Sequence, residues 1–463
     1  MDSQSPATLF ALAVQSLLNS EPEVIHALQH IPRRLFVPFF KAAFMGGHKN
    51  IITRMVKIWP FTCLHMGTLN VQEPQHELLK AMVESLPVFP NQNSDFRSCE
   101  LRVLDLRKDD GCKTVCSESN DKSVTCFHAC AYSEHSILKR ESRCNVVNSE
   151  SEGQSSRQPM ELLVDICLNG TLGEDEFLSF LLSKAKESLG FLHLCCRDLQ
   201  IYKLCNCKST LSCLDLQCVK ELSFNQASLS EVTKILSQVV QLDKLSLSKI
   251  TCKSLNGIIC GNFTTQLRRM DHLKELNLSF CLTDHLENIL SVLPSGLDFL
   301  SLNSCRLSHN DFKFLSQCPQ VNHLKQLNLS NNRIFSEDCE SLHTLLQKVS
   351  GTLQHLAIDY CLLTDATLPV LISSISHCSH LRLLRFGCNP ITMPMLKRVM
   401  QHLTCLMELK YVVYSLPVHC YGIWDFLGRL DPQKFAEVKA EISMMLQVAQ
   451  RNDMKWITYF EEI

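Results

Sequence analysis

The sequence predicts an α/β fold: a curved leucine-rich-repeat solenoid with parallel strands on its concave face, helices outside and a helical cap at the N-terminus. The first observation is a recurring Leu-x-x-Leu-x-Leu motif, in which other apolar residues replace some leucines. Most steps between successive copies fall within the ~20–29 residues typical of leucine-rich repeats. The copies begin at Val219, Leu242, Leu273, Leu297, Leu324, Leu353, Leu381 and Leu406.

Each copy predicts one short strand followed by one helix. Alternate strand residues point to opposite faces, so the leucines face the interior and the residues between them line the concave surface. The ninth position holds Cys or Asn, as at Cys305 and Asn332. We expect this small polar side chain to satisfy backbone groups freed where the strand turns. The helical spacing i, i+3, i+4, i+7 follows one strand at Leu286, Ile289, Leu290 and Leu293.

The rest of the chain divides by composition and periodicity. Residues 1–95 predict a helical cap, and residues 96–107 contain a first repeat strand around Leu104. Ser, Lys, Glu, Asp and Asn dominate 108–159, which predicts a flexible insertion because little apolar periodicity remains there. The solenoid then spans 160–416. A C-terminal helical cap over 417–463 would cover the edge of the last repeat.

Charge and cysteine content exclude several classes of protein. The 463 residues carry 45 Lys+Arg against 47 Asp+Glu, so no basic excess predicts direct nucleic-acid or membrane-surface binding. No apolar run approaches the ~18 residues of a membrane-spanning helix, and an acid at Asp2 is untypical of a secretory signal. The 25 cysteines are therefore expected to be reduced thiols. We expect the protein in the cytoplasm and leave the nucleus open.

Several segments together resemble one known family. They are Ile31–Phe36, Trp59–Leu64, Leu101–Arg107, Leu192–Cys196 and Cys305–Cys318. These segments are similar to the PRAME (preferentially expressed antigen in melanoma) family, and within it to the oogenesin-like branch. The resemblance implies a leucine-rich-repeat fold, expression in germ cells or early embryo, and a role as substrate receptor of a cullin-2 ubiquitin ligase. Residues 108–159 match the family least well.

The N-terminal segment resembles a known partner-binding motif. Thr8-Leu9-x-x-x-Ala13-x-x-x-Leu17 is similar to the elongin-binding BC box, in which a helix inserts an apolar stripe into a groove on elongin C. Ala13 stands where Cys is usual. The resemblance implies elongin B/C as partners, bound through these four residues. The alternative is that the stripe packs on the N-terminal end of the solenoid.

A second motif follows the first along the chain. Ile31-Pro32-x-x-Leu35 resembles the apolar-Pro-x-x-apolar signature of the cullin-2 box. Pro32 would fix the turn, while Ile31 and Leu35 would offer apolar anchors to a groove on the partner. The resemblance therefore implies cullin-2 as a further partner.

A protein target would bind the concave face. Outward strand positions of successive copies should form a row one strand apart, and this row is mostly small and polar. Aromatic anchors would then come from flanking positions. The alternative is an ordinary solvated sheet face. The predicted target-binding residues are Asn277, Phe280, Phe299, Ser301, Asn328, Tyr360 and Arg385.

Metal and enzyme chemistry find little support in the sequence. Six cysteines crowd between Cys195 and Cys218, but no Cys-x₂-Cys pair occurs there at zinc-finger spacing. Several fall on or beside apolar repeat positions, where Cys acts as a small hydrophobe. Neither GxxxxGK[ST] nor GxGxxG occurs. We therefore expect no catalytic site, no metal and no cofactor.

Two functional hypotheses remain. In the first, the chain is a non-catalytic substrate adaptor: its N-terminal helices hold elongin B/C and cullin-2, and its solenoid presents an unidentified protein target for ubiquitination and proteasomal degradation. In the second, the chain is a leucine-rich-repeat scaffold or transcriptional repressor that regulates proliferation, differentiation and apoptosis without any cullin. Neither hypothesis involves a small-molecule substrate, a membrane or direct nucleic-acid binding.

Overall fold

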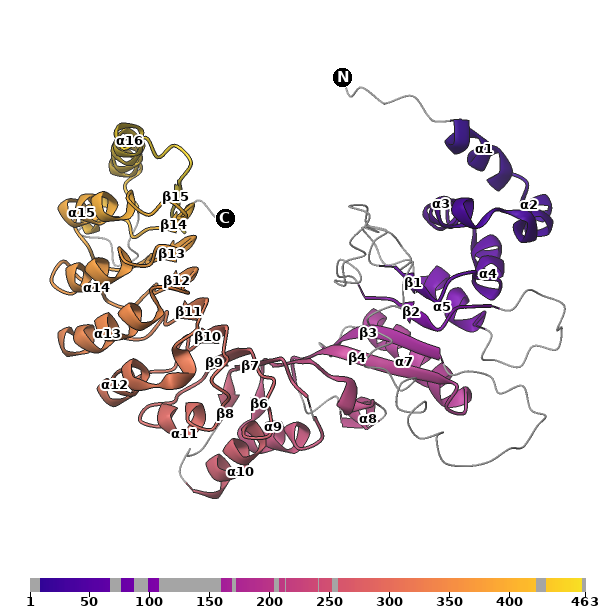
Figure 1. The fold of residues 1–463 in the computed structure, drawn as a ribbon, viewed down its shortest axis with the longest axis horizontal. Coiled ribbons are helices and arrows are strands. Elements are labelled where there is room, and N and C mark those ends of the chain that lie inside the picture. The colour runs from indigo at the N-terminus through magenta and orange to yellow at the C-terminus, as the bar shows by residue number, and fades with distance from the viewer. Residues whose placement is uncertain are drawn as a thin grey trace. The chain divides into compact units, whose positions relative to one another are not determined.

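The computed structural model divides into two compact units (Figure 1). The N-terminal unit comprises Met1–Leu199 and Asn206–Val219, and the C-terminal unit comprises Gln200–Cys205 and Lys220–Ile463. Strands that the sequence assigns to the beginning of the solenoid thus belong to the unit that contains the N-terminal helices. The structure describes residues 9–66, 76–86, 99–107, 160–168, 172–203, 208–212, 214–239, 241–251, 257–421 and 430–459. The predicted insertion over 108–159 lies outside them.

Helices form most of the N-terminal unit. Proline shapes their ends: Pro22 lies in the first turn of one helix, and Pro32 is the N-cap of the next, where its missing N–H costs no hydrogen bond. Trp59 anchors their core, with ring centroids 5.5 Å from Phe36 and 5.0 Å from Phe40 in edge-on contacts. The helices are α1 (Leu9–Leu18), α2 (Glu21–Ala27), η1 (Leu28–His30), α3 (Arg33–Met45), α4 (Lys49–Lys57), α5 (His76–Glu84), α7 (Leu172–Glu187), α8 (Lys208–Leu211) and η5 (Leu216–Cys218).

Four strands accompany these helices in the described part of the unit. In spatial order they are β1 (Cys63–His65), β2 (Val103–Asp105), β3 (Met160–Leu168) and β4 (Leu192–Ile201). β2 pairs in parallel with both β1 and β3. The strand expected around Leu104 is β2, and its three residues are all buried.

The C-terminal unit is a parallel array in which each of the eight motif copies forms one strand. The prediction of a leucine-rich-repeat solenoid is thereby confirmed. A ninth strand, β15, comes from the end segment and pairs with β14. In order, the strands are β5 (Glu221–Phe224), β7 (Lys244–Ser248), β9 (Glu275–Ser279), β10 (Phe299–Ser301), β11 (Gln326–Asn328), β12 (His355–Ala357), β13 (Leu383–Arg385), β14 (Tyr411–Val413) and β15 (Lys455–Ile457).

Helices line the other side of this strand array (Figure 1). Ser228 and Ser308 begin two of them with capping boxes, in which the serine and an acidic residue three positions later bond each other's backbone N–H. Among the described residues, no helix has the length and apolarity needed to cross a bilayer. The elements are β6 (Ala227–Ser228), α9 (Leu229–Leu236), β8 (Ile250–Thr251), α10 (Ile258–Leu267), α11 (Leu286–Leu290), α12 (His309–Gln317), η6 (Pro319–Val321), η7 (Ser336–Asp338), α13 (Cys339–Val349), α14 (Leu368–Ile375), α15 (Met393–Leu403), η8 (Val418–Cys420) and α16 (Pro432–Val448).

Buried polar side chains at the ninth motif position close the turns after the four consecutive strands β10 to β13. Asn332 is fully buried, and its Nδ2 donates to the carbonyls of Leu302 at 2.8 Å, Leu329 at 2.8 Å and Ser330 at 3.2 Å. Its Oδ1 accepts a bond from the Leu307 backbone N–H. One amide thus ties its own turn to the preceding repeat, as the sequence predicts.

The repeats of β10, β12 and β13 use the same kind of bond. Asn389 donates to three backbone carbonyls and accepts from two N–H groups. Cys305 and Cys361 are fully buried, and their thiols bond the carbonyls of Leu278 and Leu329, at 3.1 and 3.4 Å. Burial raises the pKa of both thiols to about 12, so they remain protonated donors at neutral pH.

The remaining four copies lack this device, and one of them corrects a prediction. Their ninth residues are Ala227, Ile250, Cys281 and Tyr414. After β9, Cys281 is exposed, while the preceding Phe280 is only 6% exposed. Phe280 was predicted to be an aromatic anchor for a target, and its burial excludes that role.

We expect Asn389→Ala to destabilise the C-terminal unit. The change leaves three carbonyls and two N–H groups without their amide partner. The free energy of unfolding should fall by about 2–4 kcal/mol, since each buried unsatisfied group costs ~1–3 kcal/mol and relaxation recovers part of the total. Urea denaturation followed by circular dichroism measures the shift. Asn288→Ala, on the exposed face of α11, is the control and should leave the midpoint unchanged.

Candidate functional site

The N-terminal helix α1 presents an apolar stripe to solvent. Val14 and Leu18 are buried and hold the helix, which packs against α2 and α3. The opposite face is open: Leu9 is 86% exposed and Leu17 is 44% exposed. Thr8 lies outside the described residues. The exposed residues, called the α1 stripe from here on, are Leu9, Leu12, Ala13 and Leu17.

The second predicted motif lies at the start of α3. Pro32 is exposed as the N-cap, Ile31 before it is half-buried, and Leu35 in the first turn is 42% exposed. Arg33 fixes this turn, because its guanidinium donates to the carbonyl of Pro60 and forms a 2.6 Å ion pair with Glu100. Two apolar side chains therefore flank a rigid proline at the surface of the N-terminal unit.

The strand register of the C-terminal unit forms the row that the sequence predicts. Asn277, Ser301, Asn328, Ala357 and Arg385 are successive partners across β9 to β13. They occupy equivalent positions on parallel strands, so one strand spacing separates each from the next.

Ser301 was predicted to bind a target, but its side chain is not accessible to solvent. Ser301 is only 3% exposed, because its short side chain lies between the longer amides of Asn277 and Asn328. It is therefore not available for target contact. The two amides are half-buried: Asn277 donates to Ser246 Oγ at 3.1 Å, and Asn328 Oδ1 accepts from the backbone N–H of Ser330.

A second outward row carries more charge and more aromatic surface. Lys244 lies between Glu221 and Glu275, with its Nζ 3.6 and 3.3 Å from their carboxylates. Further along, Tyr411 is 48% exposed, and Lys455 Nζ lies 5.7 Å from its ring centroid. Only Phe299 of this row was predicted, and it is half-buried. From Glu221 to Leu383, the residues of this row directly precede the second leucine of their motif copy, so the sequence marks their positions. Tyr411 differs, because the motif places it at the inward third position of the last copy, whereas in β14 it faces outward and Val412 is buried.

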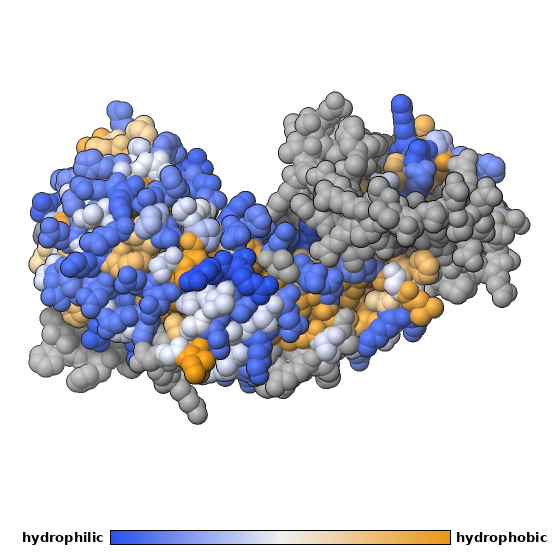
Figure 2. All heavy atoms as spheres, turned by 60° about the horizontal axis from the view of Figure 1, so that its bottom comes forward, coloured by the Kyte–Doolittle hydropathy of each residue, from blue (hydrophilic) through white to orange (hydrophobic). Residues whose placement is uncertain are grey.

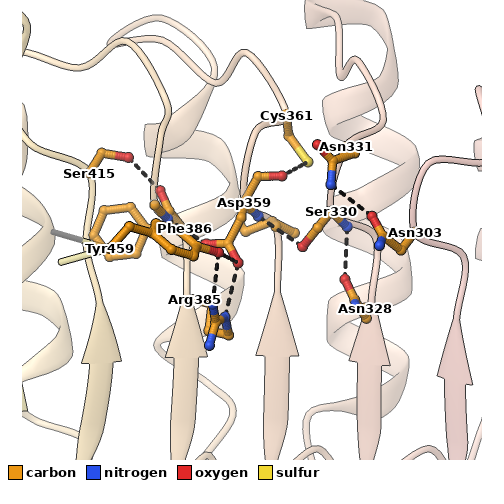
Figure 3. Close-up of polar contacts among 12 residues, drawn as sticks. Asn303, Asn328, Ser330, Asn331, Asp359, Cys361, Arg385, Phe386, Ser415 and Tyr459 are labelled. Carbon is orange, nitrogen blue, oxygen red and sulfur yellow. Dashed lines mark hydrogen bonds and ion pairs between the residues drawn. The ribbon is translucent and has the colours of Figure 1, made fainter. Parts of the chain in front are cut away.

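Arg385 belongs to a polar cluster at the ends of the strands, shown in Figure 3. Its Nε donates to Asp359 Oδ2 at 3.0 Å, and its Nη2 donates to the Tyr459 hydroxyl at 2.7 Å. The Tyr459 hydroxyl in turn donates to Asp359 at 2.6 Å. Burial disfavours the charge of Arg385, but these bonds outweigh it and raise the pKa of the guanidinium. Arg385 is thus held rigidly.

A glycine permits this cluster to close. The N–H of Gly387 donates to Asp359 Oδ1 at 2.6 Å. A Cβ at Gly387 would lie 2.6 Å from a ring carbon of Tyr459, well inside contact distance. Asp359 and Tyr459 were not predicted, because Tyr459 lies in the end segment, far from Arg385 in the chain.

Tyr360 is the accessible aromatic residue beside this cluster. Its ring is 49% exposed and lies 5.7 Å from the ring of Tyr459. A hydrogen bond to Cys388 is the main cause that raises the pKa of Tyr360 to about 12. Its backbone is left-handed, with φ of 55°, as at Asn331 and Cys388 in neighbouring repeats. A left-handed backbone is strained for most residues, and residues without a branched β-carbon tolerate this strain best. The turn therefore directs the aromatic side chain of Tyr360 outward.

These surfaces are suited to binding proteins. They carry the rigid guanidinium of Arg385 and the half-exposed rings of Tyr360 and Tyr411, and arginine and tyrosine are residue types enriched in protein interfaces. Figure 2 shows the C-terminal unit, on the left, as mostly hydrophilic, with hydrophobic residues in small separate groups.

Comparison with known proteins identifies the family. Residues 6–112 match the family model of the PRAME N-terminal domain, and residues 160–460 match that of the PRAME C-terminal domain. Human PRAME family member 12 is 31% identical over 462 residues, covering 96% of this chain and 91% of the relative. Human PRAME family members 8 and 7 are each 30% identical, covering 96% of this chain and 93% of each relative. These descriptions name no catalytic activity. With both domain models matched and the repeat fold in place, the chain belongs to the PRAME family.

Proposed function

We propose that this protein is a substrate adaptor of a cullin-2 ubiquitin ligase, joined to it through elongin B/C. The observation that carries the proposal is the α1 stripe, because four apolar side chains at helical spacing face solvent while Val14 and Leu18 hold the helix in place. An amphipathic helix with an open apolar face fits the groove-binding mode in which residues at i, i+4 and i+8 act as anchors.

The start of α3 supports the same proposal. An exposed proline followed by an exposed leucine offers a second apolar contact on the N-terminal unit. Ile31 is half-buried and would contribute only its outer atoms. The adaptor would do no chemistry itself. It would hold a target near the ubiquitin-charged enzyme, and the gain in rate would come from proximity.

Replacing Leu9 and Leu17 by Asp should abolish elongin C binding. Burial of a leucine in a groove contributes ~1.5–3 kcal/mol, so the double variant should bind at least ~100-fold more weakly. Isothermal titration with purified elongin B/C measures this. Gln15→Asp is the matched control, since it adds a charge to an exposed position of α1 outside the stripe and should bind like the parent. Equal binding by the double variant and the parent would refute the elongin proposal.

Replacing Pro32 by Ala and Leu35 by Asp should weaken cullin-2 recruitment while elongin binding persists. The paired change removes the fixed turn and an exposed apolar anchor from α3. Gel filtration of the chain with elongin B/C and the N-terminal part of cullin-2 separates the two steps. Lys41→Asp, also exposed on α3, should leave the assembly intact. Cullin-2 retained in stoichiometric amount by the double variant would contradict this role for the motif.

The runner-up function is a scaffold or repressor that acts through the solenoid alone. It is favoured by the exposed aromatic residues Tyr360 and Tyr411, which lie on a unit separate from the α1 stripe. The two functions differ in one respect: an adaptor's targets should accumulate when the proteasome is inhibited or when the α1 stripe is disrupted. A scaffold's partners should not change in amount.

Tyr360→Ala combined with Tyr411→Ala should remove bound targets but not elongin C. Each change deletes a half-exposed ring of the kind that dominates interface energies, with an expected loss of about tenfold or more in affinity. Quantitative mass spectrometry of purified complexes, with and without proteasome inhibitor, provides the measurement. Met407→Ala removes a still more exposed apolar side chain, 70% exposed and outside the strands, and is the control. If the double variant retained the same bound proteins as the parent, target binding would not depend on Tyr360 and Tyr411.

A further inference from the structure

A compact group of potential metal ligands lies in the N-terminal unit, on elements other than α1 and α3. His193 projects from β4, while Asp215 and Cys218 belong to the η5 turn, Asp215 as its N-cap and Cys218 as its last residue. Their nearest ligand atoms all lie within 4.8 Å of one another. The strand and the turn are thus brought together around three groups of the types that bind transition metals.

The distances between these atoms fit a shared cation. His193 Nε2 is 3.3 Å from Asp215 Oδ2, and Cys218 Sγ is 4.0 Å from that nitrogen and 3.7 Å from that oxygen. Zinc bonds of ~2.3 Å to sulfur and ~2.0–2.1 Å to nitrogen or oxygen give tetrahedral edges of about 3.3–3.6 Å. Contraction by a few tenths of an ångström would close the site.

The nearest candidate for a fourth donor is Cys195, although its sulfur does not lie within 4.8 Å of all three ligand atoms and would have to move to complete a site. Cys195 lies two residues after His193, so both side chains project from the same face of β4. The Cys195 sulfur accepts a hydrogen bond from the Cys218 thiol, so the two side chains are in contact. Cys195 also packs with Cys63, Val103 and Leu163 in a core cluster, and Cys218 packs against that cluster.

The arrangement does not suit a catalytic triad. In a triad, one imidazole nitrogen faces the nucleophile and the other faces the carboxylate. Here Asp215 and Cys218 both contact Nε2 of His193, while Nδ1 is buried and has no hydrogen-bond partner among the described residues. Convergence of a thiol, a carboxylate and an imidazole on one point is the geometry of metal ligands.

The surroundings favour a divalent cation. Asp215 is already oriented, because its Oδ1 accepts a bond from the Gln217 N–H and leaves Oδ2 directed at His193. Glu161, only 2% exposed, acts electrostatically on both His193 and Cys195. A zinc ion would offset the negative charge of the Asp215 carboxylate, and each thiol would lose its proton on binding the ion.

We propose that His193, Asp215 and Cys218, with Cys195 as the fourth ligand, form a structural zinc site. Zinc takes four ligands of mixed sulfur, nitrogen and oxygen type in structural sites, and such sites leave no open position for catalysis. The ion would fasten the η5 turn to β4. The proposal is independent of the adaptor function, since it involves neither the α1 stripe nor the concave face.

Metal content of the full chain tests the proposal. Protein purified with a reductant and exchanged into metal-free buffer should retain about one zinc per chain, measured by inductively coupled plasma mass spectrometry. Asp215→Asn and Cys218→Ser should each retain less than about a tenth of that amount. Cys195→Ser should bind zinc at least ~10-fold more weakly. Cys405→Ser, which removes an exposed thiol from the other unit, should retain the full amount.

A second measurement covers variants that fold poorly. Cobalt(II) added to the metal-free parent should give visible bands of tetrahedral cobalt with a sulfur-to-cobalt charge-transfer band, and zinc should displace them. Folded, reduced parent protein that takes up neither metal would overturn the proposal. So would full zinc retention by Cys218→Ser, or a chain purified under reductant that holds Cys195 and Cys218 as a disulfide without metal.

Discussion

Hydrogen bonds from buried side chains to the turns after β10 to β13 hold the central repeats of the C-terminal unit in their repeating form. Most of its strands are three residues long and could not fix their own register. Asn332, Asn389, Cys305 and Cys361 bond carbonyls of their own turn and of the preceding repeat. An unpaired carbonyl in this interior would cost free energy, so each side chain sets the position of the next strand as well as its own.

The spacing set by these turns determines the concave surface. Parallel strands in strict register place Glu221, Lys244 and Glu275 side by side, and they bring Arg385 beside Asp359. The same register buries Ser301 between two longer side chains. A surface of this kind is preorganised: its charged groups are already bonded to one another, so a partner would recognise fixed positions without ordering long side chains.

In the N-terminal unit, helix α1 has one buried face and one apolar face that is exposed to solvent. Val14 and Leu18 are sufficient to seat α1, which leaves the leucines of the α1 stripe in water at a cost that only a partner would offset. Elsewhere in the unit, the ten-residue strand β4 and the η5 turn bring thiol, imidazole and carboxylate groups together around His193. A small strand layer of this kind gains rigidity from a cross-link between elements that share few other contacts.

The sequence by itself determined the repeat array, because apolar periodicity and the ninth-position Asn or Cys are local features that recur at a readable interval. It also located the helices of the N-terminal segment and the outward row from Asn277 to Arg385. Only the tertiary structure decided which of those residues reach solvent, since the burial of Phe280 and Ser301 depends on neighbouring repeats. It alone joined Tyr459 to Asp359, and His193 to Asp215 and Cys218. A search for paired cysteines does not find the group around His193, because its pairs are His-x-Cys and Asp-x-x-Cys. His193 and Asp215 are 22 positions apart, so they can become ligands of one ion only when folding brings β4 and the η5 turn together.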